Sequence, residues 1–133
     1  VAAFSSWNGL GLHHGEACVM SDARRGGWTW GRLENGVLTD VPAVLPAEQA
    51  RVSVAECMGK GVPVFSTETA DHLAAREMSG IVPVYPSAEA LGAVWLSLAE
   101  ARREELLESP AEPLYVRAPH ITRAKRPAWA VKA

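Results

Sequence analysis

The chain has 133 residues, a formal net charge of −2 and a hydrophobic fraction of 48%. These values are typical of one compact domain and exclude a disordered or strongly basic chain. The apolar stretch from Leu91 to Leu98 is far shorter than the roughly 20 residues of a membrane span, and no segment resembles a signal peptide. We therefore expect a cytoplasmic protein with no membrane association.

Charge is unevenly distributed along the chain. Five basic residues and no acidic one follow Pro113, which leaves eight basic against fifteen acidic residues in the preceding part. The five are Arg117, Arg123, Lys125, Arg126 and Lys132. Such a tail binds a nucleic acid or an acidic partner, or it is simply solvated, and we favour the solvated state because prolines interrupt the run.

The first third of the chain predicts three antiparallel strands. The segments 16–22 (EACVMSD) and 27–35 (GWTWGRLEN) flank an Arg24-Arg25-Gly26 tip. Segment 36–44 (GVLTDVPAV) follows an Asn35-Gly36 pair, which is a strong hairpin signal.

The next elements alternate between helix and strand. Residues 46–58 repeat apolar side chains at helical spacing, and 62–66 (VPVFS) is a short strand of the kind buried on both faces. A second helical stripe over 70–78 precedes a second buried strand at 81–85 (IVPVY). Pro86 and a capping Ser87 then open the longest expected helix. Its expected buried residues are Leu91, Val94, Trp95 and Leu98.

This order predicts an α/β fold: a mixed sheet of three antiparallel strands followed by parallel strands, with helices on its faces. That is a ribonuclease H-like, or actin-like, half-domain, which we place at 1–112, with a terminal strand and basic tail at 113–133. Enzymes of this class gather carboxylates at strand ends to bind metal ions. Here Asp22 ends the first strand and Asp40 lies near the third, and no DxD or GxGxxG motif is present.

Other reactive residues do not predict a site. Cys18 and Cys57 lack a CxxC spacing, so we expect two buried thiols in preference to a disulfide or a metal pair. His13, His14 and Glu16 offer three zinc ligands, but adjacent histidines diverge and no fourth ligand is apparent. The serines lack the G-x-S-x-G pattern and no H-E-x-x-H motif occurs, which argues against a protease. We expect no cofactor and no metal.

Two separated motifs resemble a known family. The stretches SDARRGGWTWGRLENG (21–36) and EPLYVRAP (112–119) are similar to the C-terminal half of the TsaB family, also filed as glycoproteases. Bacteria need TsaB proteins to make threonylcarbamoyladenosine on transfer RNA. The family pattern also includes a proline-acid helix start, which corresponds to PAEQA at 46–50. The resemblance implies a non-catalytic partner of TsaD, the ligase subunit that holds the metal and the nucleotide.

The chain also departs from the family pattern. Gly27 stands where the family usually has glutamate, and STETADH (66–72) replaces a glycine-aspartate-glycine turn, which argues against phosphate binding. The resemblance also implies an N-terminal half of similar fold, which makes most of the family's contact with TsaD, and we expect this sequence to correspond to the C-terminal half alone. Without that N-terminal half, the face that it would cover is exposed, and we therefore expect a homodimer.

Five residues are candidates for binding a partner or an anion: Asp22, Arg24, Arg25, Tyr115 and Arg117. We favour the view that Asp22 accepts backbone hydrogen bonds in the turn, that Gly26 and Gly27 take unusual φ angles and that one arginine pairs with an acid. Alternatively, the two arginines bind transfer-RNA phosphate or an acidic partner through their guanidinium groups. The segment around Tyr115 and Arg117 is expected to form a last edge strand, with Arg117 covering the sheet. Alternatively, Tyr115, Arg117 and the basic tail form one surface that binds a partner or RNA.

Trp28 and Trp30 lie two residues apart, so their side chains share one face of a strand, where we expect core packing in preference to base stacking. The favoured function is a non-catalytic subunit that supports threonylcarbamoyladenosine formation through contacts with a TsaD-like subunit. The alternative is a metal-dependent hydrolase or ATPase that uses Asp22 and Asp40.

Overall fold

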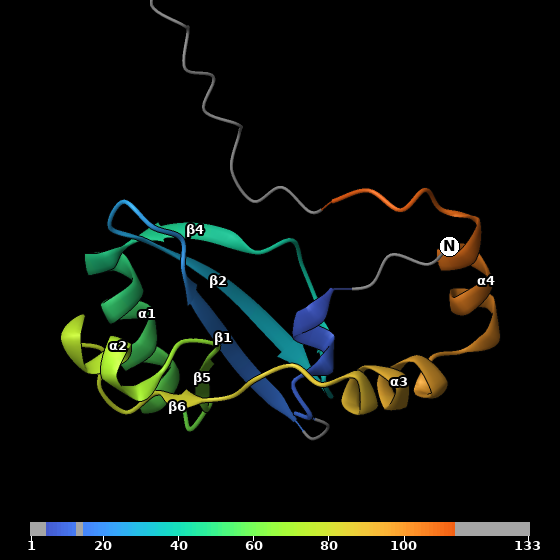
Figure 1. Cartoon of the computed structure of the whole chain (residues 1–133). Coiled ribbons are helices and arrows are strands. Elements are labelled where there is room, and N and C mark those ends of the chain that lie inside the picture. Colours follow the sequence, from blue (N-terminus) through green and yellow to red (C-terminus); the bar gives the residue numbers. More distant parts are fainter. Residues whose placement is uncertain (1–4, 13–14, 114–133) are drawn as a thin grey trace, which may run out of the picture.

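The protein has an α/β fold built on one mixed, open, six-stranded sheet (Figure 1). The computed structural model describes residues 5–12 and 15–113. The strands are β1 (Glu16–Asp22), β2 (Gly27–Glu34), β3 (Val37–Leu38), β4 (Ala43–Pro46), β5 (Val64–Ser66) and β6 (Val82–Pro83). The helices are η1 (Ser6–Gly9), a 3-10 turn, and α1 (Ala47–Gly59), α2 (Ala70–Ala75), α3 (Ala88–Ser97) and α4 (Glu100–Glu108).

The strands follow the order β3-β2-β1-β5-β6, and β4 also pairs with β2. β1 is antiparallel to β2 and parallel to β5, and β6 continues the parallel part. The predicted class is thus confirmed: antiparallel strands come first, parallel strands follow, and helices pack on the sheet. None of the helices in the described ranges is both long and apolar enough to cross a bilayer.

The predicted Asn35-Gly36 turn joins β2 and β3. Both residues have positive φ angles, 49° and 83°, as a type I′ hairpin turn requires. The Asn35 Oδ1 atom also accepts a hydrogen bond from the Gly15 backbone N–H at 3.1 Å, which fastens this turn to the start of β1. Local turn chemistry therefore sets the register of the first hairpins.

The expected third strand is split in two. β3 pairs with the end of β2 and β4 with its beginning, so that Leu33 faces Leu38 and Trp28 faces Leu45. Between them the chain bends at Asp40, and Pro42 has no N–H to donate to a ladder. The prediction of one continuous strand over 36–44 is therefore wrong, although both pieces lie on the expected edge of β2.

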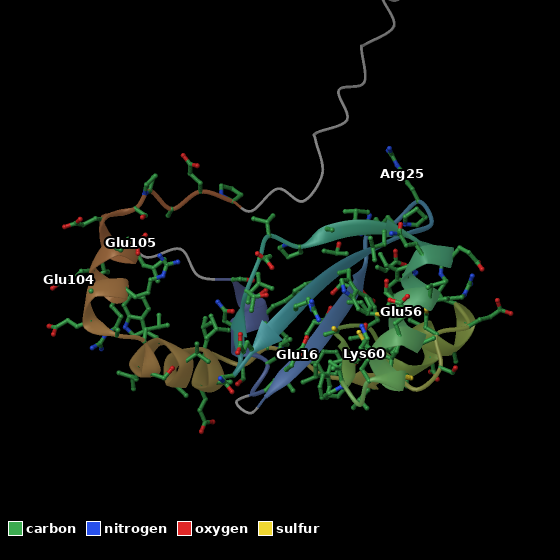
Figure 2. All side chains as sticks on the ribbon, turned by 180° about the vertical axis from the view of Figure 1, so that it is seen from behind. Glu16, Arg25, Glu56, Lys60, Glu104 and Glu105 are labelled. Carbon is green, nitrogen blue, oxygen red and sulfur yellow. The ribbon has the colours of Figure 1, made fainter. Side chains whose placement is uncertain are left out.

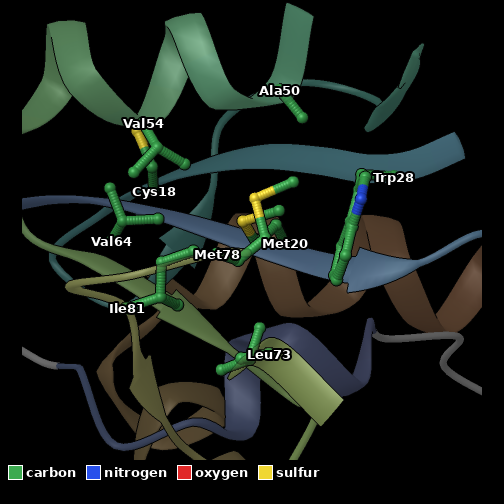
Figure 3. Packing of buried hydrophobic residues seen from close by; sticks show 9 residues of the cluster. All are labelled: Cys18, Met20, Trp28, Ala50, Val54, Val64, Leu73, Met78 and Ile81. Carbon is green, nitrogen blue, oxygen red and sulfur yellow. The ribbon is translucent and has the colours of Figure 1, made fainter. Parts of the chain in front are cut away.

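The main core lies between the sheet and the helices α1 and α2 (Figure 3). Nine buried residues form it: Cys18, Met20, Trp28, Ala50, Val54, Val64, Leu73, Met78 and Ile81. Trp30 is half-buried and packs against the same cluster, so the two tryptophans share a face, as predicted from their spacing. They serve as core residues, with Trp28 only 3% exposed.

A second cluster covers the opposite face of the sheet. Val19 and Leu33 are buried there under the segment around η1, which contributes Trp7 and Leu10. A Cβ atom on Gly31 would come within 2.6 Å of the Trp7 ring, so a glycine lets the indole lie directly on β2. α3 packs on η1, and Figure 1 shows this pair on the side of the molecule away from α1 and α2.

β6 is the last strand of the described sheet, and it is not buried on both faces as the apolar run IVPVY predicted. Its Val82 side chain is 54% exposed, although Ile81 just before it is in the core. Val84 donates its N–H to the Ser66 carbonyl oxygen at 2.7 Å, so the preceding Pro83 faces away from β5. A proline is tolerated there because that position has no neighbour that needs its N–H.

The predicted long helix after Ser87 is interrupted. Ser87 caps α3 as expected, since its hydroxyl accepts the Ala90 N–H at 3.1 Å. Leu98 then takes an extended conformation with ψ 144°, and the charged run forms the separate helix α4, which has no buried residue. Of the four side chains expected to be buried, only Val94 is fully so, and Leu91, Trp95 and Leu98 are half-buried.

Candidate functional site

The structure places three of the five candidate residues together. Asp22 ends β1, and Arg24 and Arg25 form the tip between β1 and β2. Tyr115 and Arg117 lie outside the described residues, as does the basic tail, so the expectations for them stay predictions.

Asp22 accepts a backbone hydrogen bond in the turn, as expected. Its Oδ1 atom lies 2.6 Å from the Arg24 backbone nitrogen. Ala23 donates to the Gly27 carbonyl oxygen at 2.9 Å, and Gly27 donates back to the Arg24 carbonyl oxygen at 3.1 Å. Asp22 and these two backbone bonds together hold the tip closed.

Three consecutive residues of the tip are left-handed. The φ angles are 61° at Arg24, 52° at Arg25 and 76° at Gly26. The expectation of an unusual angle at Gly26 is confirmed, but Gly27 has none, and the other two fall on the arginines. For L-residues this conformation costs about 1–2 kcal/mol each. The tip therefore carries local strain while presenting two guanidinium groups.

Asp22 is also joined to helix α2, which the sequence did not predict. Its Oδ2 atom lies 2.8 Å from His72 Nε2 and 3.7 Å from Arg76 Nη2. Its backbone N–H donates to a Glu68 carboxylate oxygen at 3.0 Å. One carboxylate, only 16% exposed, thus ties the end of β1 to the tip and to α2.

These contacts lower the pKa of Asp22. Burial alone would raise it, but the hydrogen bonds from the Arg24 backbone and His72, together with the positive charge of Arg76, favour the carboxylate form and bring the pKa below its ordinary value. A carboxylate with these donors is a structural clamp. Because its oxygens already have partners, it is poorly placed to act as a base.

His72 lies at the junction of the clamp and the core. Its ring packs edge-on against Trp28, with ring centroids 6.2 Å apart and planes at 62°. The Thr69 side chain caps α2 by accepting the His72 N–H at 3.2 Å, so the helix start orients the histidine. A lone histidine 50 residues from Asp22 in sequence offers no spacing signal for such a pair.

Arg24 and Arg25 have no ion pair with any other residue in 5–12 or 15–113. Both are exposed, and Figure 2 shows the Arg25 side chain projecting from the tip into solvent. The expectation that one of them pairs with an acid is wrong. The arginine that meets Asp22 is Arg76, which directly follows α2.

Arg25→Gly is expected to raise the free energy of unfolding by about 0.5 kcal/mol, because the steric cost of a left-handed L-residue exceeds the entropic cost of glycine. Urea unfolding monitored by tryptophan fluorescence measures the change. Arg25→Ala keeps the strain and serves as the control, with no change expected. If Arg25→Gly instead lowers stability by more than about 1 kcal/mol, the guanidinium braces the turn.

A small cavity of about 150 Å³ adjoins this cluster. Its lining includes Asp22, Arg51, Arg76 and Glu77, together with the backbone of Gly26 and Gly27. Arg51 lies 3.1 Å from Glu48 and 3.6 Å from Glu77. The acidic and basic side chains lining the cavity are equal in number, so it attracts neither a phosphate nor a metal ion by net charge.

Asp40 does not join Asp22. It lines a different cavity, of about 360 Å³, with Glu16, Arg32 and Glu34. Glu16 begins β1 and Asp22 ends it, and a strand of seven residues spans roughly 20 Å. Because Asp40 lies at the Glu16 end of β1, the structure does not bring Asp40 and Asp22 to one metal ion. Within the described ranges, no three His, Cys, Asp or Glu side chains form a metal-binding group, and His13, His14 and His120 lie outside them.

Comparison with models of protein families gives no match. Comparison with curated proteins gives no match either.

Proposed function

We propose that the chain is a ribonuclease H-like half-domain of the TsaB type that acts as a non-catalytic subunit in threonylcarbamoyladenosine formation on transfer RNA, through contacts with a TsaD-like ligase subunit. The observation that carries the proposal is the strand order β3-β2-β1-β5-β6, antiparallel in its first part and parallel in its second. This is the sheet expected of such a half-domain.

The positions of the motif residues support the proposal. The Asp-Ala-Arg-Arg-Gly run forms the tip between the first two strands, the aromatic strand β2 follows it, and the PAEQA segment opens α1. These three stretches follow one another in the order that the resemblance implies, which supports the proposal. The second motif, EPLYVRAP, lies largely outside the described residues.

The tip offers a contact surface for this role. Arg24 and Arg25 are exposed and have no ion pair within the described ranges, while Asp22 and the two backbone hydrogen bonds hold the turn beneath them. Guanidinium groups bind carboxylates and phosphates with two parallel hydrogen bonds. We assign the tip to an acidic patch of the ligase subunit, with transfer-RNA phosphate as the second ligand of the same chemistry.

Calorimetric titration of the protein with the TsaD-like subunit of its source organism tests the proposal. We expect binding, weakened at least tenfold in the double variant Arg24→Ala/Arg25→Ala. Arg102→Ala/Arg103→Ala on α4 removes the same charge from another adjacent arginine pair and is expected to leave the affinity unchanged. Absence of binding by the unaltered protein would refute the subunit role, and equal loss in both variants would refute the assignment to the tip.

A further inference from the structure

The two cysteines of the chain meet across the main core. Cys18 lies on β1 and is fully buried, whereas Cys57 lies near the end of α1 and is half-buried. Their Sγ atoms are 3.2 Å apart, and both are free thiols. Figure 3 shows Cys18 on the face of β1 turned toward α1, close to Val54 of that helix. The pair is 39 residues apart in sequence, so no motif indicates it.

We propose that Cys18 and Cys57 form a redox site, in which a small-molecule disulfide such as oxidised glutathione converts the two thiols into a reversible disulfide bond between β1 and α1. This inference is independent of the proposed function. It goes beyond the expectation of two buried thiols, because the two sulfur atoms are in contact and Cys57 is only half-buried.

The geometry favours a bond within the chain. A disulfide needs the sulfur atoms at about 2.05 Å, so side-chain rotation has to bring them little more than 1 Å closer. The backbone at Cys57 is held in place, since its carbonyl oxygen accepts the N–H groups of Lys60 and Val62 at 3.1 and 2.9 Å. The Cys18 thiol therefore already lies beside the Cys57 thiol, whereas a thiol of another molecule would have to diffuse to Cys57 from solvent.

The two thiols have different roles in the exchange. Burial, and then the hydrogen bond with Cys57, raises the pKa of Cys18 to about 12, so this thiol stays protonated. The half-buried Cys57 is the one that meets a reagent from solvent. We assign the first attack to Cys57 and the closing step to Cys18.

The exchange balances in two steps. The Cys57 thiolate attacks one sulfur of oxidised glutathione, the S–S bond of the reagent breaks, and one glutathione thiolate leaves. Cys18 then loses its proton and attacks the Cys57 sulfur of the mixed disulfide as a thiolate, and the bond from Cys57 to glutathione breaks. The proton of Cys57 goes to the first glutathione thiolate and that of Cys18 to the second. The two protein thiols are oxidised, and one oxidised glutathione is reduced to two molecules of glutathione.

The test is to incubate the folded protein with a mixture of reduced and oxidised glutathione and measure its intact mass. We expect most molecules to lose two hydrogen atoms, to carry no glutathione and to form no disulfide link to another molecule. Before reduction, an alkylating reagent should find no free thiol on the unfolded chain. Dithiothreitol should restore the original mass. The bridged form should also unfold at a higher temperature than the reduced form, since the bond constrains the unfolded chain.

A control variant keeps the number of thiols and moves one of them. Cys57→Ser combined with Glu56→Cys leaves two cysteines, but the second now replaces an exposed residue on the outer side of α1, where Figure 2 labels Glu56. We expect this variant to carry one glutathione and no bridge. Three results for the unaltered protein would each overturn the proposal. They are a single glutathione adduct, a disulfide-linked dimer, and no reaction under conditions that bridge the unfolded chain.

Discussion

Trp28→Ala is expected to lower the free energy of unfolding by about 3–5 kcal/mol, the range for removing a large buried aromatic side chain. The indole is 3% exposed and lies in the main core with Met20 and Leu73. It also packs edge-on against His72, so its removal leaves a cavity where the core meets the Asp22 clamp. Urea unfolding followed by circular dichroism gives the change, because this signal does not depend on the deleted fluorophore.

Leu96→Ala is the matched control. Leu96 is 73% exposed on α3, so its truncation should change stability by less than about 0.5 kcal/mol. Trp28→Phe keeps an aromatic ring in the core, so its loss of unfolding free energy should lie between those of Trp28→Ala and Leu96→Ala. A loss below about 1 kcal/mol for Trp28→Ala would contradict the description of this cluster as the core that joins the sheet to α1 and α2.

Asp22→Ala is expected to cost about 2 kcal/mol at neutral pH, because it removes a largely buried carboxylate that accepts the Arg24 N–H, is hydrogen-bonded to the His72 ring and lies 3.7 Å from the partly exposed Arg76 guanidinium. The Arg24 N–H loses its acceptor, and His72 loses its link to β1. Chemical unfolding at pH 7 gives this difference. The exposed Asp40 is the control, since Asp40→Ala should change stability by less than about 0.5 kcal/mol.

The effect of Asp22 should depend on pH in a defined direction. Its pKa is lower in the folded protein than in the unfolded chain, so the folded state favours the charged form. The stabilisation is complete above the unfolded pKa of about 3.9 and is lost as the pH falls below it. The unfolding free energies of the unaltered protein and of Asp22→Ala should therefore converge below about pH 4. A difference that stays constant down to pH 2 would show that charge has no part in the clamp.

The elements that the sequence predicted correctly depend on local chemistry. The Asn35-Gly36 turn follows from two residues that tolerate positive φ angles, and the start of α3 follows from the Ser87 hydroxyl. The order of strands and helices follows from the periodicity of apolar residues, because each run has to bury one face. These signals act over a few residues, and sequence alone is sufficient to detect them.

The features that the sequence did not predict depend on contacts between distant segments. His72 meets Asp22, and Cys57 meets Cys18, only because α2 and α1 pack across the same face of the sheet. The exposure of Val82 was missed for the same reason, since an apolar run does not tell whether a further strand lies beside it. Sequence spacing carries no information about these neighbours.

Pro83 has a consequence for how molecules of this protein can associate. An open sheet edge invites a strand of another chain to continue the hydrogen-bonding ladder, which is a common route to aggregates and to strand-exchanged dimers. Here the outward-facing position of β6 is a proline, which has no hydrogen to offer such a strand. Among the described strands, we therefore expect sheet extension to be less favourable at β6 than at the opposite edge, where β3 and β4 lie.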